Sequence, residues 1–132
     1  MTPYLLDTNT VVFLFKGQGQ VGPRLLATLP GDVALPAVVV YELEVGAALS
    51  KSPARRKDQF AALLEAVRVI PFGRAEAAVA AEIRADLERR GEGIGPLDTL
   101  IAGTALANRA TLVTHNPREF GRVRGLRVED WY

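Results

Sequence analysis

The stretch Tyr4-Leu5-Leu6-Asp7-Thr8-Asn9-Thr10 decides the fold expected for this chain. A short apolar run leads to an acid, three small polar residues follow, and residues 11–15 are apolar again. This pattern predicts a buried strand that ends at Asp7, followed by a helix that Thr8 or Asn9 caps. In open α/β sheets, ligands bind at such strand-to-helix turns. Asp7 taken alone is better explained as an ordinary helix cap, so other residues must decide whether the turn is a site.

Strand and helix patterns alternate along the rest of the chain. Short strands are expected at residues 33–35, 69–70 and 110–113, with an edge strand at 126–128. Helices are expected at residues 8–16, 23–29, 37–49, 53–67, 74–90 and 96–107. Residues 37–49 also have strand propensity, but the segment is longer than a typical strand. The alternation predicts one α/β domain over residues 1–132, with a parallel sheet covered by helices.

Composition excludes several classes of site. The 132 residues include no cysteine, which excludes disulfides, thiolate zinc sites and a cysteine nucleophile. The single histidine, His115, excludes a two-histidine ribonuclease mechanism within one chain. A metal would therefore be held mainly by oxygen atoms, which favours Mg²⁺ or Mn²⁺. The net charge of +1 gives no overall attraction to nucleic acid, although most basic residues are arginines, which suit phosphate.

The sequence contains no targeting or membrane-spanning pattern. Residues 1–7 lack a basic segment, and their apolar run is too short for a signal peptide. No apolar stretch is long enough to cross a membrane. We therefore expect a cytoplasmic protein.

Two further acids occur in apolar settings. Glu42 is predicted on a helical stripe shared with Val38, Val45, Gly46 and Leu49. A buried carboxylate must be paired, protonated or bound to metal, and an ion pair with an arginine is the alternative to a metal. Asp98 falls in the first turn of the helix at 96–107, where a charge is often only favourable to the helix N-terminus. The face of Asp98 is apolar, however, which predicts that its side chain points inward; its neighbours there are Ile101, Ala102 and Ala105.

The predicted sheet brings these acids to one edge. Asp7 and Thr114 end parallel strands, and the helix that carries Asp98 begins at the same edge. Asp7, Glu42, Asp98 and a polar group from Asn116 or Glu119 are then expected to converge. Clustered carboxylates repel one another unless a cation neutralises them, and Mg²⁺ also activates water. The chemistry favoured is phosphodiester cleavage, with arginines holding the backbone of the nucleic acid.

Four segments resemble the motifs of PIN-domain ribonucleases, and more narrowly of VapC-type toxins from bacterial toxin–antitoxin pairs. They are Leu5-Leu6-Asp7-Thr8-Asn9, Tyr41-Glu42-Leu43-Glu44-Val45-Gly46, Gly95-Pro96-Leu97-Asp98-Thr99-Leu100-Ile101-Ala102 and Leu112-Val113-Thr114-His115-Asn116-Pro117-Arg118-Glu119-Phe120. The closing segment 125–131 is similar to the usual tail of the group. The resemblance covers nearly the whole chain in the right order.

The resemblance implies a three-layer α/β/α sandwich, a homodimer and Mg²⁺- or Mn²⁺-dependent endoribonuclease activity. It also implies a cognate VapB-type antitoxin that covers the site, and it favours a tRNA anticodon stem-loop as the RNA. By motif, Asp7 and Asp98 bind the metal and Glu42 is the third acid, while Asn9 and Thr114 orient carboxylates and waters. Asn116 stands where the family often has an Asp, and Glu119 lies further on, so one tight ion is expected.

Other interpretations remain open from the sequence. A catalytically inactive RNA- or protein-binding module has no evident use for three inward acids. A small Mg²⁺-dependent phosphatase or receiver-like domain is disfavoured, because it requires an acid pair near the first strand and a lysine at a later strand end. His115 is assigned no catalytic role, since a single histidine in a turn is usually a surface group. Trp131 and Tyr132 are candidates to stack on a base, although such aromatics more often pack on the core or on a dimer partner.

Overall fold

The computed structural model describes residues 4–132. Two expectations also cover residues 1–3, namely the domain that begins at residue 1 and the lack of a signal peptide, and that part of each lies outside the described residues. The strands are β1 (Tyr4–Leu6), β2 (Val33–Pro36), β3 (Arg68–Ile70), β4 (Thr111–Val113) and β5 (Val128–Glu129). The helices are α1 (Thr8–Lys16), α2 (Val21–Leu26), α3 (Ala37–Leu49), α4 (Pro53–Ala66), α5 (Arg74–Arg89), α6 (Pro96–Ala107) and α7 (Pro117–Phe120), with a 3₁₀ turn at Pro30–Asp32.

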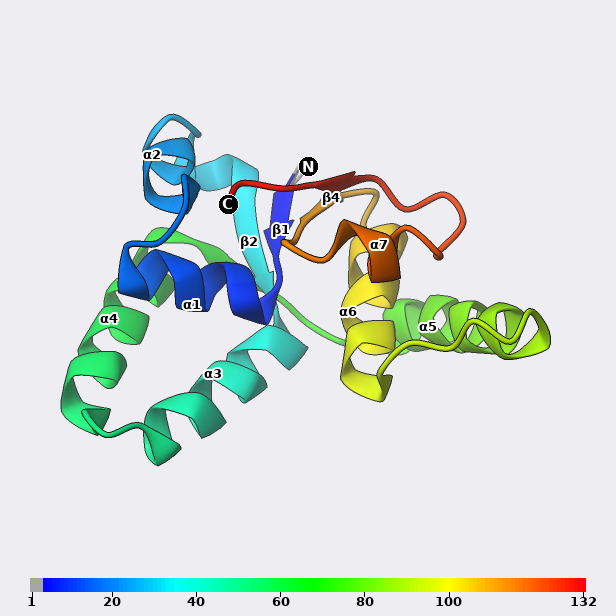
Figure 1. Ribbon diagram of the computed structural model, residues 1–132, viewed down its shortest axis with the longest axis horizontal. Helices are drawn as coiled ribbons and strands as arrows, with labels where there is room; N and C mark the ends of the chain where they lie inside the picture. Colours follow the sequence, from blue (N-terminus) through cyan, green and yellow to red (C-terminus); the bar gives the residue numbers. More distant parts are fainter. Residues whose placement is uncertain (1–3) are drawn as a thin grey trace.

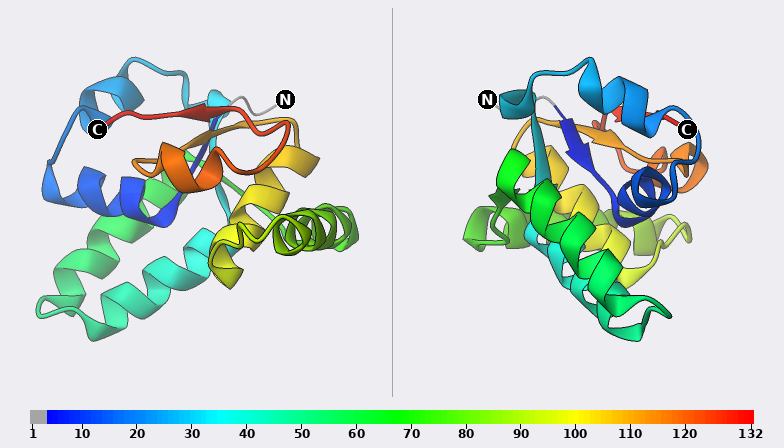
Figure 2. Two further views of the ribbon diagram at one scale, coloured as in Figure 1. Left: turned by 45° about the vertical axis from the view of Figure 1, so that its right-hand side comes forward. Right: turned by 90° about the vertical axis from the view of Figure 1, so that its left-hand side faces the viewer.

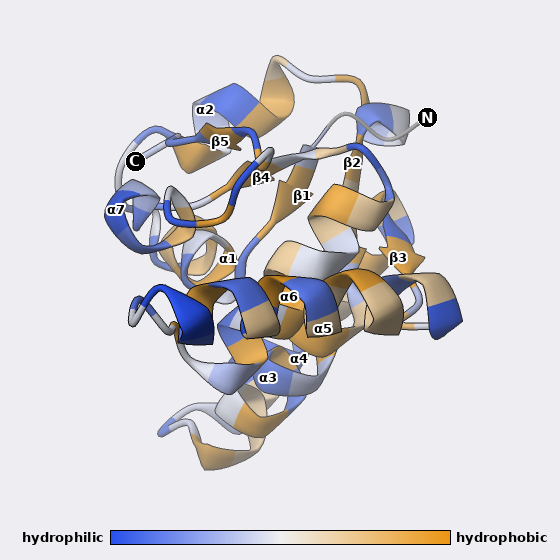
Figure 3. Ribbon diagram, turned by 90° about the vertical axis from the view of Figure 1, so that its right-hand side faces the viewer, coloured by the Kyte–Doolittle hydropathy of each residue, from blue (hydrophilic) through white to orange (hydrophobic). Residues whose placement is uncertain are grey.

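The five strands form one parallel sheet in the order β3-β2-β1-β4-β5. Figure 1 shows α1 and α2 on one side of this sheet and α5 and α6 on the other, which confirms the predicted three-layer arrangement. Strand β2 is fully buried, and β1 and β4 are buried after their first residues, which explains why these strands are almost entirely apolar. Figure 3 shows the same contrast, with hydrophobic strands β1 and β4 beside the hydrophilic helix α7.

The carboxyl ends of the strands define the edge that matters for function. Strand β1 leads into α1 and β2 leads into α3 at this edge, and α6 begins there (Figure 1). Helices α3 and α4 form a hairpin that projects beyond the edge in both views of Figure 2. Three separate elements therefore present their first helical turns to one region of the surface.

Helices α5 and α6 pack at unusually close range. A Cβ atom added at Gly103 would lie 2.6 Å from the Cβ of Ala80 and 2.8 Å from its Cα. Glycine at this position lets the two backbones approach, and the contact fixes the direction in which α6 carries its first turn towards the carboxyl edge.

Among residues 4–132, every helix is too short or too polar to cross a membrane.

Candidate metal centre

Asp7 is held rigidly where β1 meets α1. Its backbone N–H donates to the carbonyl of Val113 at 3.0 Å, which ties it to β4. Its side-chain Oδ1 accepts a hydrogen bond from the N–H of Thr10 at 2.9 Å. Asp7 is therefore the cap of α1, and the expectation that Thr8 or Asn9 supplies the cap is wrong. The cap uses one carboxylate oxygen, and the side chain is only 6% exposed.

Glu42 lies at the border of the buried face of α3, and the predicted apolar stripe around it is wrong. Val45 is 42% exposed and Leu49 is 81% exposed, whereas the buried positions of α3 are Val38, Val39, Leu43 and Ala47. Helix α3 is apolar on nearly every side, so its sequence does not identify the face that is buried. Glu42 is half-buried, and its Oε1 accepts a hydrogen bond of 2.7 Å from the hydroxyl of Thr8.

Asp98 is half-buried in the first turn of α6, as its apolar face predicted. Burial and then the negative charges of Glu119, Glu42 and Asp7, in that order of size, together raise the pKa of its carboxyl to about 6. The charges of Glu119, Glu42 and Asp7 therefore all act on the carboxyl of Asp98. The assignment of these acids to one metal site remains a prediction.

Asn116 directs Glu119 towards the other acids. The Oδ1 of Asn116 accepts from the N–H of Glu119 at 3.4 Å, and its Nδ2 donates to Glu119 Oε2 at 2.7 Å. The other oxygen of Glu119 accepts from the N–H of Gly95 at 3.4 Å, next to the start of α6. Asn116, Pro117 and Glu119 have the spacing of a helix cap, a first-turn proline and a capping-box acid. That signal in the sequence identifies α7, which we did not predict.

The two residues expected to orient carboxylates and waters, Thr114 and Asn9, differ in burial and in hydrogen bonding. Thr114 is fully buried, and its hydroxyl accepts from the N–H of Asn116 at 3.0 Å. Asn9 is exposed, and within the described part of the chain its side chain has no hydrogen-bond partner. Asn9 and Asp7 line a small cavity of about 80 Å³, together with Phe13, Thr114, His115 and Asn116.

The charges of these carboxylates are not neutralised by basic side chains. Between residues 4 and 132, none of Asp7, Glu42, Asp98 and Glu119 forms an ion pair with an arginine, lysine or histidine. The alternative in which an arginine compensates Glu42 is therefore wrong for this part of the chain. Nor do any three acidic or histidine side chains of these residues lie close enough to ligate one ion as they stand. The oxygen donors and their mutual repulsion fit a hard divalent cation that draws them together.

A second cavity of about 340 Å³ adjoins Glu42 between α1, α3 and α4. Apolar side chains form most of its wall, and Lys16 and Arg56 lie at its polar positions; the apolar members are Val12, Phe15, Leu43, Ala47 and Phe60. This second cavity, called the groove below, is lined by Thr8 and Glu42, which are hydrogen-bonded to each other. Because Glu42 is also one of the carboxylates, a chain bound in the groove would reach the acidic site.

Comparisons with known proteins agree with the family resemblance of the four sequence motifs. Residues 4–126 match the family described as PIN domain. The chain is 35% identical over 131 residues to the tRNA(fMet)-specific endonuclease VapC of Shigella flexneri, covering 99% of each chain. It is 33% identical to ribonuclease VapC2 of Rickettsia felis, with 97% of each covered. The chain superimposes with a TM-score of 0.94 on a structure of DNA-bound VapBC from Salmonella typhimurium, at 32% identity and with all of both chains covered.

Proposed function

Because the chain belongs to the PIN-domain family and to its VapC ribonucleases, we propose that it is a metal-dependent endoribonuclease and the toxin of a VapBC-type toxin–antitoxin pair. The reaction is hydrolysis of phosphodiester bonds in RNA. The observation that carries this proposal is the group of four carboxylates at the carboxyl edge of the sheet, with no basic side chain of residues 4–132 paired to any of them.

We assign the metal to Asp7 and Asp98, with Glu42 as the third acid. A bound Mg²⁺ or Mn²⁺ would neutralise phosphate charge and activate water. The protein contributes orientation: Asp7 is fixed by its cap, the hydroxyl of Thr8 holds Glu42, and Asn116 holds Glu119. Glu119 is then the fourth acid, supplied three residues after Asn116. Asn9 faces the cavity beside Asp7 and is free to bind water or substrate, whereas Thr114 acts through the backbone of Asn116.

The first substrate class to test is tRNA, because two of the relatives are named for tRNA(fMet). The anticodon stem-loop is the favoured region from the family resemblance. Arg118, exposed on α7 beside Glu119, has no acidic partner within the described residues and is suited to hold a phosphate group. RNA as a substrate also implies a cytoplasmic location.

The partner proposed is a VapB-type antitoxin, because the similar structures from Salmonella typhimurium and Rickettsia felis are VapBC assemblies. The groove beside Glu42 suits an apolar segment of such a partner, and a cationic side chain on that segment would reach the carboxylates. A homodimer is the expected state of the toxin and is checked by light scattering of the purified chain.

The test is incubation of the purified protein with total bacterial RNA in Mg²⁺, in Mn²⁺ and in EDTA. Asp7→Asn is the matched inactive variant, because Asn caps a helix as well as Asp does but lacks the charge. Discrete fragments that require metal and disappear in Asp7→Asn are expected, and sequencing of their ends identifies the RNA. If the wild type and Asp7→Asn are indistinguishable in every metal, the inactive binding module becomes the better explanation.

A further inference from the structure

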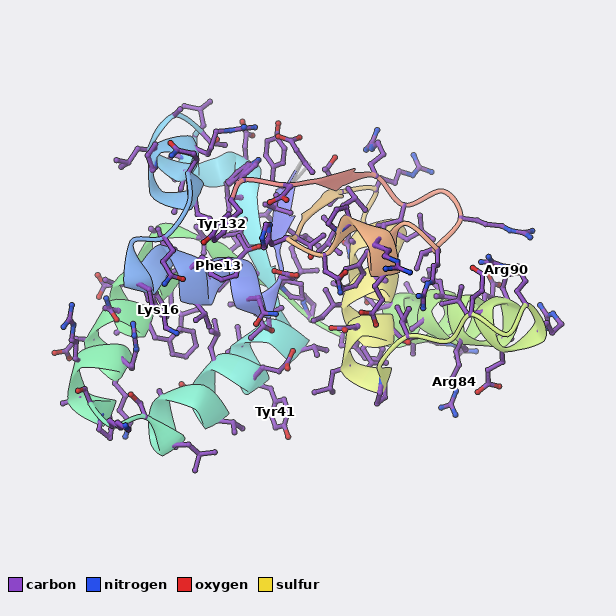
Figure 4. All side chains as sticks on the ribbon, in the orientation of Figure 1. Phe13, Lys16, Tyr41, Arg84, Arg90 and Tyr132 are labelled. Atoms are coloured by element: carbon purple, nitrogen blue, oxygen red, sulfur yellow. The ribbon has the colours of Figure 1, made fainter. Side chains whose placement is uncertain are left out.

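An aromatic cluster lies beside the carboxylates and has no role in the metal chemistry. The rings of His115 and Tyr132 are stacked, with centroids 4.2 Å apart and planes 23° from parallel. Phe13 on α1 meets both rings at their edges, at 4.8 Å from Tyr132 and 5.6 Å from His115. Figure 4 shows Phe13 and Tyr132 together where α1 meets the last described residues.

His115 stacks on one face of Tyr132, and Phe13 lies at the edge of the stack. A ring on the opposite face of Tyr132 would be much farther than 5.6 Å from His115, so Phe13 does not cover that face. A Cβ at Gly19 would lie 2.9 Å from Cδ2 of Tyr132, so the loop after α1 borders one side of the ring. Tyr132 is 49% exposed, and the His115 side chain is 45% exposed. Packing on the core does not explain this tyrosine, since the neighbouring Trp131 is only 2% exposed and takes that role.

The stack is fixed by a single carboxylate. Asp130 accepts the backbone N–H of Tyr132 on Oδ1 at 2.9 Å, and its Oδ2 lies 2.9 Å from Nδ1 of His115. Partial burial acts to raise the pKa of Asp130, but the hydrogen bonds from Tyr132 and His115 outweigh it and hold the pKa below its usual value. Asp130 therefore stays ionised at neutral pH and orients both rings.

The segment that carries Tyr132 is also tied to the loop after α1. The carbonyl of Trp131 accepts from the N–H of Gln20 at 3.0 Å, and its indole N–H donates to Glu129 at 2.8 Å. Gly19 has a positive φ of 66°, and a Cβ there would lie 2.8 Å from the backbone of Tyr132. Glycine at this position permits the close approach. Tyr132 is thus preorganised, and little conformational entropy remains to be lost when a ligand stacks on it.

The cluster and the metal centre share a wall. Phe13 and His115 line the same 80 Å³ cavity as Asp7 and Asn9. The cavity is too small for a base, but Asp7 and His115 both line it. A phosphodiester held at Asp7 would therefore bring one of its two adjoining nucleosides towards His115 and the Tyr132 ring stacked on it.

We propose that Tyr132, backed by His115, is a stacking platform for one unpaired nucleobase next to the scissile phosphate. This inference rests on the proposed nuclease function and adds the class of substrate: RNA that is single-stranded, or splayed out in a loop, at the cut. Unstacked bases bind aromatic side chains in this way, whereas a base inside a duplex is already stacked and cannot reach the ring. Every base has a π face, so the platform selects unpaired structure and not sequence.

The first experiment measures binding without cleavage. A single-stranded oligoribonucleotide carrying one 2-aminopurine is titrated with protein in Ca²⁺, and the same strand is titrated as a duplex. We expect the wild type and Tyr132→Phe to quench the fluorescence of 2-aminopurine more in the single strand than in the duplex. Tyr132→Leu keeps an apolar side chain but no ring, and should weaken binding of the single strand roughly 5- to 140-fold, as for the loss of one stacked base. Equal binding and quenching by Tyr132→Leu and the wild type would overturn the proposal.

The matched control is Tyr41→Ala. Tyr41 is an exposed tyrosine on α3, 58% exposed, and Figure 4 shows it on a different part of the surface from Phe13 and Tyr132. Its removal should leave quenching unchanged. Circular dichroism melts of each variant separate loss of folding from loss of stacking. His115→Leu is a second variant, which removes the ring behind Tyr132 and the contact with Asp130 while Tyr132 itself is unchanged.

The second experiment uses an RNA that spans the mapped cut, with the base removed from each flanking nucleotide in turn. One abasic site should raise KM for the wild type by the same factor as Tyr132→Leu does with intact RNA. The same abasic site should then have no further effect on Tyr132→Leu, since both changes remove one contact. Fully additive losses would contradict the platform. If the wild type does not cleave at all, the nuclease proposal fails, while the quenching result still decides the platform.

Discussion

Asn116 and Glu119 form a closed pair at the start of α7, in which each side chain fixes the other residue. Asn116 Nδ2 donates to Glu119 Oε2 at 2.7 Å, and Asn116 Oδ1 accepts from the backbone N–H of Glu119. The pair makes a short helix cap the support for Glu119, the fourth carboxylate of the proposed metal centre. Asn116 stands where an Asp was expected, and Glu119 supplies an acid three residues further on, in the first turn of α7.

Asn116→Ala is expected to lower cleavage about 10- to 100-fold, the usual effect of removing a group that orients a metal-binding carboxylate. It also removes a helix cap, which costs roughly 0.5–2 kcal/mol of stability. Asn116→Ser separates the two effects, because Ser still caps but cannot donate to Glu119 as the amide does. Cleavage rates and melting temperatures of both variants provide the measurement. Full activity in Asn116→Ser would show that Glu119 needs no orientation.

Gly103→Ala should destabilise the whole domain. The added methyl would lie 2.6 Å from the Cβ of Ala80, against backbone that cannot move aside cheaply. Overpacking of this kind costs about 1–3 kcal/mol and outweighs the gain in helix propensity. Gly46→Ala on α3 is the control, since a Cβ there meets no atom within 4 Å and should stabilise slightly. Thermal unfolding of the two variants should shift in opposite directions, and shifts of the same sign would contradict the close packing.

The sequence was sufficient for the fold and for the elements that carry Asp7, Glu42 and Asp98, and local signals explain two of these placements. Asp7 and Asp98 are placed by the strand end and the helix start that contain them, and each boundary is visible in nearby residues. Glu42 was assigned to the right helix, but the apolar character of α3 on nearly every side hid which face is buried. Its hydrogen bond with Thr8 joins residues 34 positions apart, and only the packing of α1 on α3 creates it.

The stability of the metal-free protein should depend on pH through Asp98. Its folded-state pKa is raised to about 6 from 3.8, by burial first and by three carboxylates next. The ionised form is thus disfavoured in the folded state, so the penalty is present above pH 6 and is lost as the pH falls towards 4. In EDTA at pH 8, Asp98→Asn should be more stable than the wild type, by on the order of 1–2 kcal/mol after allowance for solvent screening.

Urea unfolding between pH 4.5 and 8 checks this expectation about Asp98, with the metal ion as its second variable. The gap between Asp98→Asn and the wild type should close on acidification, roughly across the interval in which Asp98 titrates. Saturating Mg²⁺ should reverse the order at pH 8, because a ligand that binds only the folded wild type stabilises it. A gap that is independent of pH would mean that folding does not change the pKa of Asp98.

Thr8→Val tests whether the hydroxyl of Thr8 matters for function and not only for packing. Val has nearly the same shape but cannot donate to Glu42 Oε1, which now accepts at 2.7 Å. Because Thr8 and Glu42 are only half-buried, the loss of stability should be about 1 kcal/mol, whereas cleavage should fall about 10- to 100-fold. Mg²⁺ titrations of activity should show a weaker midpoint, and Thr8→Ser should restore it. In the double variant with Glu42→Gln, the Thr8→Val change should have little further effect, because the hydroxyl acts through that carboxylate. Independent, additive losses in the double variant would instead place Thr8 in direct contact with the substrate or the ion.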